Sequence, residues 1–227
     1  MEAPDEWADP VKGLVPGYFK ANGKWQQSSA GLHLSASGSV VGSGMALTKW
    51  VQALLAGEGA SSGLLSMLSA EHFLSDGRPT GYGLGLRWNA IDGKRFVGHG
   101  GSHPGYKSYF LLDPVDKTGM VVVCNREDAD TYTIARDCMA ALNGLSLPEK
   151  TSAIPDGLYV SDTGPFWLEM HEGVANYLGA EDRLYDVGDG WASSLSPSSP
   201  MKLRWDGDVL QGEIGHVSRE LRPVHAK

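Results

Sequence analysis

The sequence predicts an α+β protein, an antiparallel sheet with flanking helices, followed by a small antiparallel β-barrel. Between residues 45 and 143, segments of helical periodicity flank four consecutive apolar runs of strand length. After residue 155, short runs of alternating apolar residues recur without any helical periodicity. A segment rich in proline and polar residues over 145–155 separates the two patterns. We therefore expect one domain over residues 1–150 and a second over 151–227.

Composition and charge narrow the class of protein. The 227 residues are 41% hydrophobic and 20% charged, which is ordinary for a globular protein. A formal net charge of −8 argues against nucleic acid or an anionic membrane as a partner. No stretch resembles a signal peptide or a membrane span, so a cytoplasmic location is expected; a periplasmic one would need a signal peptide upstream of Met1.

The first elements of the chain follow from proline, glycine and apolar spacing. Prolines and glycines in residues 1–30 favour an extended segment that runs over a surface. An apolar stripe at helical spacing predicts a helix over 45–57, ended by Gly57. The stripe consists of Met45, Leu47, Trp50, Val51, Leu54 and Leu55. A second, shorter helix is predicted over 64–74.

Four strands and a third helix complete the first domain. The strands are predicted over 81–88, 95–99, 106–112 and 119–125. Asp92-Gly93 is a hairpin signal between the first two strands, and residues 113–118 form the turn between the last two. A helix is predicted over 131–142, with four residues on its apolar face: Ile134, Cys138, Met139 and Leu142. Cys124 and Cys138 are expected to be two buried thiols and not a disulfide.

The last third of the chain predicts a closed barrel or a sandwich of eight short strands. Glycine, aspartate, proline or serine separates the apolar runs. The runs are 158–160, 166–170, 175–178, 184–187, 191–195, 201–205, 209–214 and 218–221. Residues 151–227 hold twelve acidic and six basic residues, so we expect the acids on a solvated outer face.

The segment Gly98–Gly105 (GHGGSHPG) is the strongest functional signal. It places His99 on a strand whose neighbouring side chains are reduced to hydrogen, so that a ligand can approach the backbone closely. Such an edge suits substrate binding and oxyanion stabilisation, but it supplies no nucleophile. The alternative is a purely structural glycine-rich edge with a hydrogen-bonded histidine.

Other local matches are interpreted as coincidences. Lys117-Thr118-Gly119 spells the K-T-G of serine β-lactamases, but the sequence places it in a hairpin turn. Ser199-Pro200-Met201-Lys202 spells S-x-x-K, but the prolines and the strand-like run that follows exclude the helix which that motif needs. His99 and His103 are four residues apart, yet no cysteine or carboxylate cluster adjoins them, so no metal is expected. No cofactor motif occurs.

An ordered set of motifs resembles one family. The set is Ala30–Ser37 (AGLHLSAS), the helix near 46–57, Gly81–Gly85 (GYGLG), Gly98–Tyr106, Asp113-Pro114, Gly119–Asn125, and a closing helix. It resembles the C-terminal half of the serine hydrolases that group with class C β-lactamases, D-Ala-D-Ala carboxypeptidases and related esterases. Histidine with two glycines in place of K-T-G, and the segment Asn125–Asp130 (NREDAD), are similar to the D-aminopeptidases, which also carry antiparallel barrels.

The resemblance implies a fold and a set of site residues. The first domain would be the C-terminal part of a β-lactamase-like fold. His99, Gly100 and Gly101 would take the three K-T-G places, and the backbone N–H of Ser102 would be an oxyanion donor. The residues implied in substrate binding are His103, Gly105, Tyr106 and Asn125. No cofactor or metal is implied.

The sequence departs from the family at the nucleophile. Residues 1–80 contain no counterpart of the family's S-x-x-K or Y-x-N, so we expect the chain to begin after them and to be inactive alone. Its partner would be the missing N-terminal half of the catalytic domain, or another chain carrying it. We also expect an apolar face to be exposed where that half packs.

The resemblance implies release of N-terminal D-amino acids from small peptides or D-amino acid amides through an acyl-enzyme. Two alternatives stay open. One is an esterase or β-lactamase-like hydrolase on the same scaffold. The other is a non-catalytic binding module.

Overall fold

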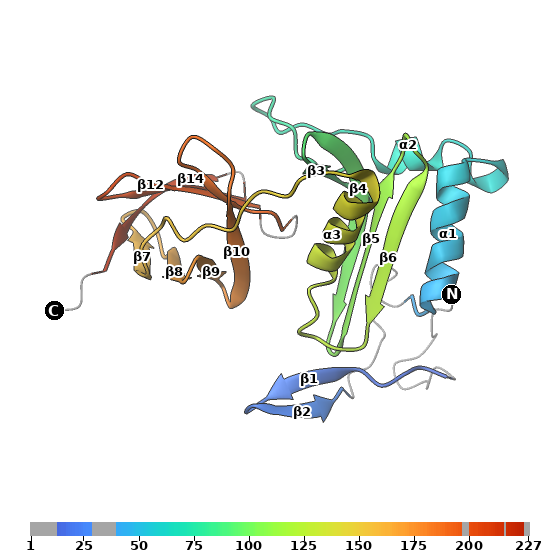
Figure 1. Ribbon diagram of the computed structural model, residues 1–227, viewed down its shortest axis with the longest axis horizontal. Coiled ribbons are helices and arrows are strands. Elements are labelled where there is room, and N and C mark those ends of the chain that lie inside the picture. Colours follow the sequence, from blue (N-terminus) through green and yellow to red (C-terminus); the bar gives the residue numbers. More distant parts are fainter. Residues whose placement is uncertain (1–12, 29–39, 197–199, 216, 225–227) are drawn as a thin grey trace. The chain divides into compact units, whose positions relative to one another are not determined.

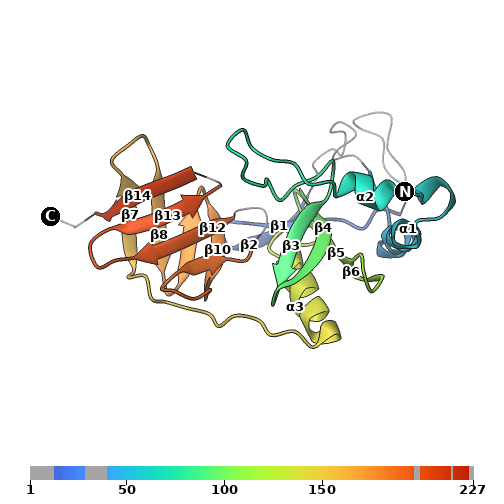
Figure 2. The same cartoon turned by 90° about the horizontal axis from the view of Figure 1, so that it is seen from above.

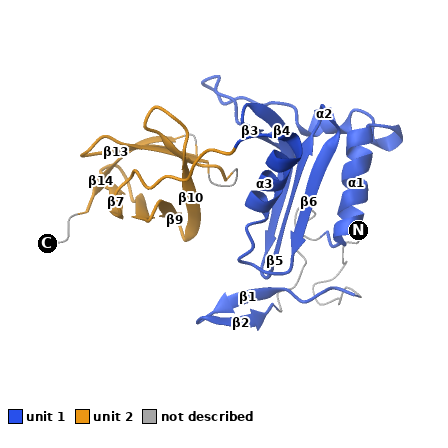
Figure 3. Ribbon diagram, in the orientation of Figure 1, with its two compact units in different colours: residues 1–146 blue, residues 147–227 orange. Residues whose placement is uncertain are grey.

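The computed structural model describes residues 13–28, 40–196, 200–215 and 217–224. The chain divides into two compact units, Met1–Ser146 and Leu147–Lys227 (Figure 3). Each has its own buried apolar cluster. In the part of the chain described, no helix is both long and apolar enough to cross a membrane.

A four-stranded antiparallel meander forms the centre of the first unit (Figure 1). Its strands, in sheet order, are β3 (Arg87–Ile91), β4 (Lys94–His103), β5 (Tyr106–Asp113) and β6 (Thr118–Cys124). Asp92 and Gly93 both have positive φ, which suits the two-residue turn between β3 and β4. The predicted α+β class and the hairpin at Asp92-Gly93 are confirmed.

Helices cover both faces of this sheet (Figures 1 and 2). Successive residues of a strand point to opposite faces, and this alternation separates the helices. Phe110 of β5 meets Trp50 of α1 (Gly44–Ala56), with ring centroids 5.5 Å apart. The neighbouring Tyr109 meets Tyr132 of α3 (Thr131–Asn143) at 5.0 Å on the other face.

The helix termini follow from the residues that cap them. The Ser43 hydroxyl accepts a hydrogen bond from the Ala46 N–H at the start of α1, and Gly57 ends the helix with positive φ. Asp130 and Gly144 cap α3 in the same way. The predicted stripe of α1 packs on the sheet, apart from Met45, which is 67% exposed.

The apolar face predicted for α3 was wrong. Of its four residues only Met139 is buried, whereas Ile134, Cys138 and Leu142 are exposed. The buried face consists of Thr131, Ala135, Arg136, Met139 and Ala140. Tyr109 of β5 occupies part of the space between helix and sheet, and two small residues, Ala135 and Ala140, are among those of α3 that are buried there. Both cysteines are free, but Cys124 is half-buried and Cys138 exposed, so the expectation of two buried thiols was also wrong.

The region between α1 and β3 is less regular than predicted. A 3₁₀ turn (Gly59–Ser61) leads to α2, which covers only Leu64–Leu68 instead of residues 64–74. The helix ends there because its last carbonyls have other partners. The Leu86 N–H donates a hydrogen bond to the Leu68 carbonyl, and the Trp88 indole N–H donates to the Ser69 carbonyl. The strand predicted over 81–88 begins only at Arg87, because Gly81 has positive φ and Gly83 lies against the backbone of residues 68–70.

A hairpin occupies part of the segment expected to be extended. It consists of β1 (Tyr18–Ala21) and β2 (Lys24–Gln27), joined by Asn22-Gly23, both with positive φ. Asn-Gly is the strongest short-range hairpin signal, so the sequence did contain the information. The AGLHLSAS stretch that contributed to the family resemblance lies outside the described residues.

The second unit is a closed barrel of eight antiparallel strands, as the sequence predicts. Closure removes both sheet edges, and the alternating residues of each strand fill the interior. The strands are β7 (Gly157–Ser161), β8 (Trp167–His171), β9 (Val174–Tyr177), β10 (Ala180–Asp186), β11 (Ala192–Ser194), β12 (Met201–Trp205), β13 (Leu210–Ile214) and β14 (Val217–Pro223). Leu168, Leu203 and Leu210 are among the fully buried core residues.

Candidate active site

The glycine-rich half of β4 has an open backbone edge. On one side, β5 pairs with β4 from Val97 to His103. On the other side, β3 pairs only with residues 94–98, and its last pair is Arg87 with Gly98. Residues 99–103 therefore have no second strand partner within the described ranges, and His99, Gly100, Gly101 and Ser102 are exposed. Backbone donors and acceptors on such an edge are available to an extended ligand.

The three glycines of this strand serve different purposes. A Cβ on Gly98 would collide with the backbone carbonyl of Phe110. A Cβ on Gly100 would lie 2.9 Å from the ring of Tyr109. Gly101 is the least constrained, because its Cβ would meet only the Ser108 hydroxyl, at 2.5 Å, and that side chain can rotate. Internal packing thus accounts for Gly98 and Gly100 but does not account for Gly101.

His99 is held by a tyrosine from the irregular segment before β3. The Tyr82 hydroxyl lies 2.6 Å from His99 Nε2, and the two rings meet edge to face. The guanidinium of Arg87 lies over the Tyr82 ring, 5.2 Å from its centroid. Tyr82 reaches this position because Gly81–Leu86 turns back along the start of β3, where Tyr82 bridges to Arg87. Tyr82 belongs to the GYGLG motif, but nothing in the sequence distinguishes it as a site residue.

Ser102 is also engaged by a neighbouring side chain. Lys107, directly opposite on β5, donates a hydrogen bond of 2.7 Å to the Ser102 hydroxyl. A cation therefore lies on the strand next to that of His99. Lys107 was not predicted from the sequence, because its proximity to Ser102 depends on the β4–β5 register.

Most of the residues expected to bind substrate form hydrogen bonds to residues 15–18, at the start of β1 and just before it. The Tyr106 hydroxyl donates to the Val15 carbonyl at 2.8 Å, and the Asn125 amide donates to the Pro16 carbonyl at 2.9 Å. The carbonyls of Gly105 and Asn125 both accept from the Tyr18 N–H. His103 lies beside Tyr106, with ring centroids 6.4 Å apart. His103, Gly105 and Tyr106 thus lie at or next to the β4–β5 turn, and Asn125 follows β6. Gly105, Tyr106 and Asn125 hold the segment that leads into β1, while His99–Ser102 form the open edge.

Burial shifts the pKa of Tyr109 and of its neighbour Tyr132. Burial raises the pKa of Tyr109 to about 12, against the smaller opposing effect of its hydrogen bond to Asn89. It also raises the pKa of Tyr132. Both phenols are therefore neutral near pH 7. The Tyr109 ring lies against Gly98 and Gly100, and Tyr132 packs against Tyr109.

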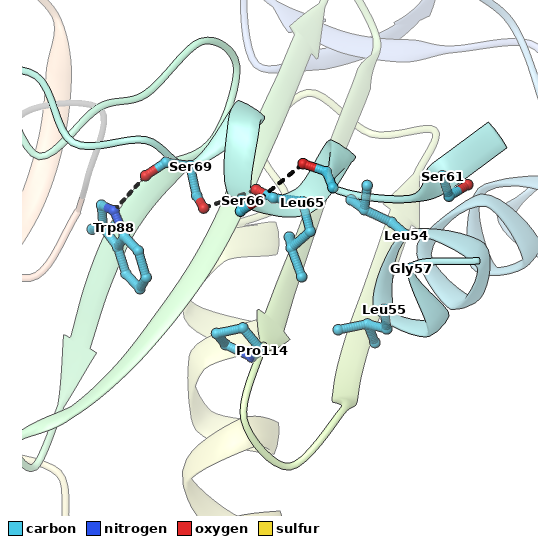
Figure 4. Close-up of a pocket in the computed structure, with 10 residues that line it drawn as sticks. Leu54, Leu55, Gly57, Ser61, Leu65, Ser66, Ser69, Trp88 and Pro114 are labelled. Atoms are coloured by element: carbon cyan, nitrogen blue, oxygen red, sulfur yellow. Dashed lines mark hydrogen bonds between the residues drawn. The ribbon is translucent and has the colours of Figure 1, made fainter. Parts of the chain in front are cut away.

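A separate hollow of about 500 Å³ lies between the helices and the far end of the sheet (Figure 4). Its lining includes Leu54, Leu55, Leu65, Trp88 and Pro114. Pro114 follows the end of β5, whereas His99 pairs with Phe110 near its middle. The hollow contains no titratable side chain in its lining, so its walls offer no acid–base chemistry.

Lys117-Thr118-Gly119 and Lys202 of the S-x-x-K match lie in a turn and in strands, as the sequence predicts. Lys117 has positive φ in the turn before β6, so the K-T-G match is a hairpin. Lys202 lies in strand β12, with its ammonium over the Trp191 ring, and Ser199 lies outside the described residues. Among the described residues, no group of three or more His, Cys, Asp or Glu could hold a metal ion.

Comparison with known proteins identifies the family. The Beta-lactamase family model matches residues 2–141, which include strands β3–β6, helices α1 and α2 and all but the last two residues of α3. The chain therefore belongs to the β-lactamase family.

The chain is similar to curated D-aminopeptidases. The enzyme of Brucella anthropi is 24% identical over 221 residues, covering 93% of this chain and 38% of the relative. That of Gluconobacter oxydans is 28% identical over 154 residues, covering 68% of this chain and 27% of the relative. The chain thus spans about a third of the length of these curated relatives.

A solved structure shows the same fold. The octameric penicillin-binding protein homologue from Pyrococcus abyssi superposes with a TM-score of 0.55 at 19% identity. The match covers 93% of this chain and 54% of that chain. It supports a β-lactamase-like fold followed by a barrel.

Proposed function

We propose that this chain forms the substrate-binding edge of a serine hydrolase that releases N-terminal D-amino acids from peptides or amides. The open edge of β4 is the observation that supports this proposal most. It exposes His99 and the following three residues, and we propose that His99, Gly100 and Gly101 correspond to the family's K-T-G. The D-aminopeptidase relatives support the choice of substrate.

In the proposed reaction, a serine hydroxyl attacks the carbonyl carbon of the N-terminal D-residue. We propose that this serine and its activating lysine belong to polypeptide outside these 227 residues. The C–N bond breaks, and the amine leaves with the proton taken from the serine. Water then cleaves the acyl ester, which releases the D-amino acid and restores the serine.

The β4 edge would act on the carbonyl oxygen. Negative charge develops on that oxygen during attack, and backbone N–H groups near Ser102 would stabilise it. The substrate would lie extended along the edge, with main-chain hydrogen bonds of the kind that a further strand makes. In this proposal His99 stands on β4 where the family has a lysine. Lys107 on the neighbouring strand β5 still supplies a positive charge near the edge.

Hydrolysis of D-alanine p-nitroanilide tests the proposal. The isolated chain is expected to show no turnover, and the complete gene product should cleave the D-anilide but not the L-anilide. In that product, His99→Ala should lower kcat/KM about 100-fold, the scale seen when one group that stabilises the oxyanion is lost. The exposed His171→Ala is the matched control and should leave kcat/KM unchanged.

Three outcomes would contradict the proposal. Turnover by the isolated chain that survives His99→Ala would place the chemistry elsewhere. Ester or β-lactam cleavage far faster than D-anilide cleavage would favour the other hydrolases on this scaffold. A complete gene product without any S-x-x-K sequence would favour a non-catalytic binding module.

A further inference from the structure

We propose that Tyr82 is a positioning residue that fixes His99 as the Nδ1–H tautomer and so presents that N–H as a hydrogen-bond donor at the open edge of β4. The proposal deepens the proposed function, because it specifies what His99 offers to a substrate. It rests on the 2.6 Å contact between the Tyr82 hydroxyl and His99 Nε2.

The direction of this hydrogen bond decides the tautomer. A neutral imidazole has one protonated and one unprotonated nitrogen. Within the described ranges, the Tyr82 hydroxyl has no acceptor other than His99 Nε2. If Nε2 carried the proton, the hydroxyl hydrogen would have no protein acceptor. If Nε2 is unprotonated, the phenol donates to it and the imidazole proton is on Nδ1.

Arg87 strengthens the same arrangement. Its guanidinium lies over the Tyr82 ring, 5.2 Å from the centroid. A cation at the face of a phenol attracts electron density from the ring, which makes the hydroxyl a better donor and a poorer acceptor. The backbone of Arg87 is itself fixed by its pairing with Gly98 at the start of β3. The backbone that opens the β4 edge therefore also orients the group acting on Tyr82.

The free nitrogen of His99 then defines the chemistry that the edge can recognise. His99 is exposed, and its Nδ1 has no partner among the residues that the structure describes. A neutral N–H donor pairs with an oxygen acceptor, such as a carbonyl or a carboxylate, and not with an ammonium group. We therefore assign to His99 the carbonyl side of the substrate. Its free amine must be recognised by other residues.

The tautomer can be measured on this chain without any activity assay. Long-range ¹H–¹⁵N correlation spectra distinguish an imidazole protonated on Nδ1 from one protonated on Nε2. At a pH where His99 is neutral, the unmodified chain should show the Nδ1–H pattern. Tyr82→Phe removes the donor but keeps the ring, and it should shift His99 to the Nε2–H pattern that imidazole prefers in water.

Tyr106→Phe is the matched control. It removes a tyrosine hydroxyl from the same sheet, one that donates to the Val15 carbonyl and does not touch His99. The His99 pattern should be unchanged in this variant. Backbone amide spectra of each variant report whether the sheet is folded.

An Nε2–H pattern in the unmodified chain would overturn the proposal. So would an Nδ1–H pattern that survives Tyr82→Phe in a folded protein. In the complete hydrolase, Tyr82→Phe should lower kcat/KM for D-alanine p-nitroanilide about tenfold, the scale of one neutral hydrogen bond. The tautomer result stands whether or not D-anilides are substrates, so failure of this inference and failure of the proposed function are distinguishable.

Discussion

At the scale of single residues, neighbouring glycines of β4 differ in what they tolerate. Gly98 is buried and lies against the Phe110 carbonyl, whereas Gly101 is exposed and lies against a rotatable serine side chain. Backbone atoms in a central strand cannot move without disturbing its hydrogen bonds, but a hydroxyl rotates at little cost. Packing therefore requires glycine at position 98, whereas it does not require glycine at position 101.

Substitution by alanine should separate these two roles. We expect Gly98→Ala to lower the free energy of unfolding by about 3 kcal/mol, the size of an overpacked core site. Gly101→Ala should change it by less than about 0.5 kcal/mol. Urea unfolding followed by fluorescence measures both variants. Equal destabilisation would show that Gly101 is as constrained as Gly98 and would remove it from the candidate site.

At the scale of elements, Lys94 joins the closed end of the sheet to a helix. Its ammonium lies 2.6 Å from the buried carboxylate of Asp113 at the end of β5 and 2.5 Å from Asp116 in the following turn. It also donates to the Asn143 side chain at the end of α3. Asp113 in turn accepts from the N–H groups of Val115 and Asp116, which shapes the turn. Lys94 thereby fixes the start of β4, whereas the open edge is formed by the last residues of the same strand.

This ion pair predicts how stability depends on pH. Burial would raise the pKa of Asp113, but the hydrogen bond from Lys94 and those from the turn outweigh it, so its pKa is lower than in the unfolded chain. The stabilisation is therefore present above the unfolded carboxyl pKa near 4 and is lost as the pH falls through the folded value. The hydrogen bonds to Asp113 and Asp116 raise the pKa of Lys94. That contribution is present below the unfolded lysine pKa and lost as the pH rises through the folded one.

Asp113→Asn tests this dependence. Between pH 5 and pH 2, the unmodified protein should lose stability more steeply than the variant, because only the unmodified protein must protonate a paired carboxylate. Thermal unfolding across this range provides the measurement, and the exposed Asp76→Asn is a control for a carboxylate in a surface pair. Parallel pH profiles for the unmodified protein and Asp113→Asn would show that the pair contributes nothing.

The sequence was informative where local pattern and tertiary environment agree. The stripe of α1 and the alternation in the barrel predict their elements because each face meets one uniform apolar neighbour. The face of α3 was not predictable, because Tyr109 on the sheet decides which of its residues fit. Within the candidate site, His99 was evident from its glycine neighbours. Tyr82 was not, because its contact depends on a turn that returns residue 82 to the start of β3.

At the scale of the whole molecule, two buried clusters imply two units of folding. The cluster of the first unit is formed by α1, β4, β5 and adjoining residues, and that of the second lies inside the closed barrel. The barrel has no sheet edge through which it needs another element to complete it. Unit 2 therefore has what a domain requires to fold alone: a closed sheet and its own apolar interior.

A cavity in the barrel should therefore leave the candidate site intact. Leu203→Ala removes a fully buried side chain of β12, and we expect the barrel to lose about 3 kcal/mol of its free energy of unfolding. Amide hydrogen exchange should accelerate in β12 and β13 but not in β4 and β5, because protection in each unit reports its own opening. Leu178→Ala, at a position that is 72% exposed, should change neither. Equal acceleration in both units after Leu203→Ala would instead mean that they unfold together, and a change in the barrel would then alter His99 and the open edge as well.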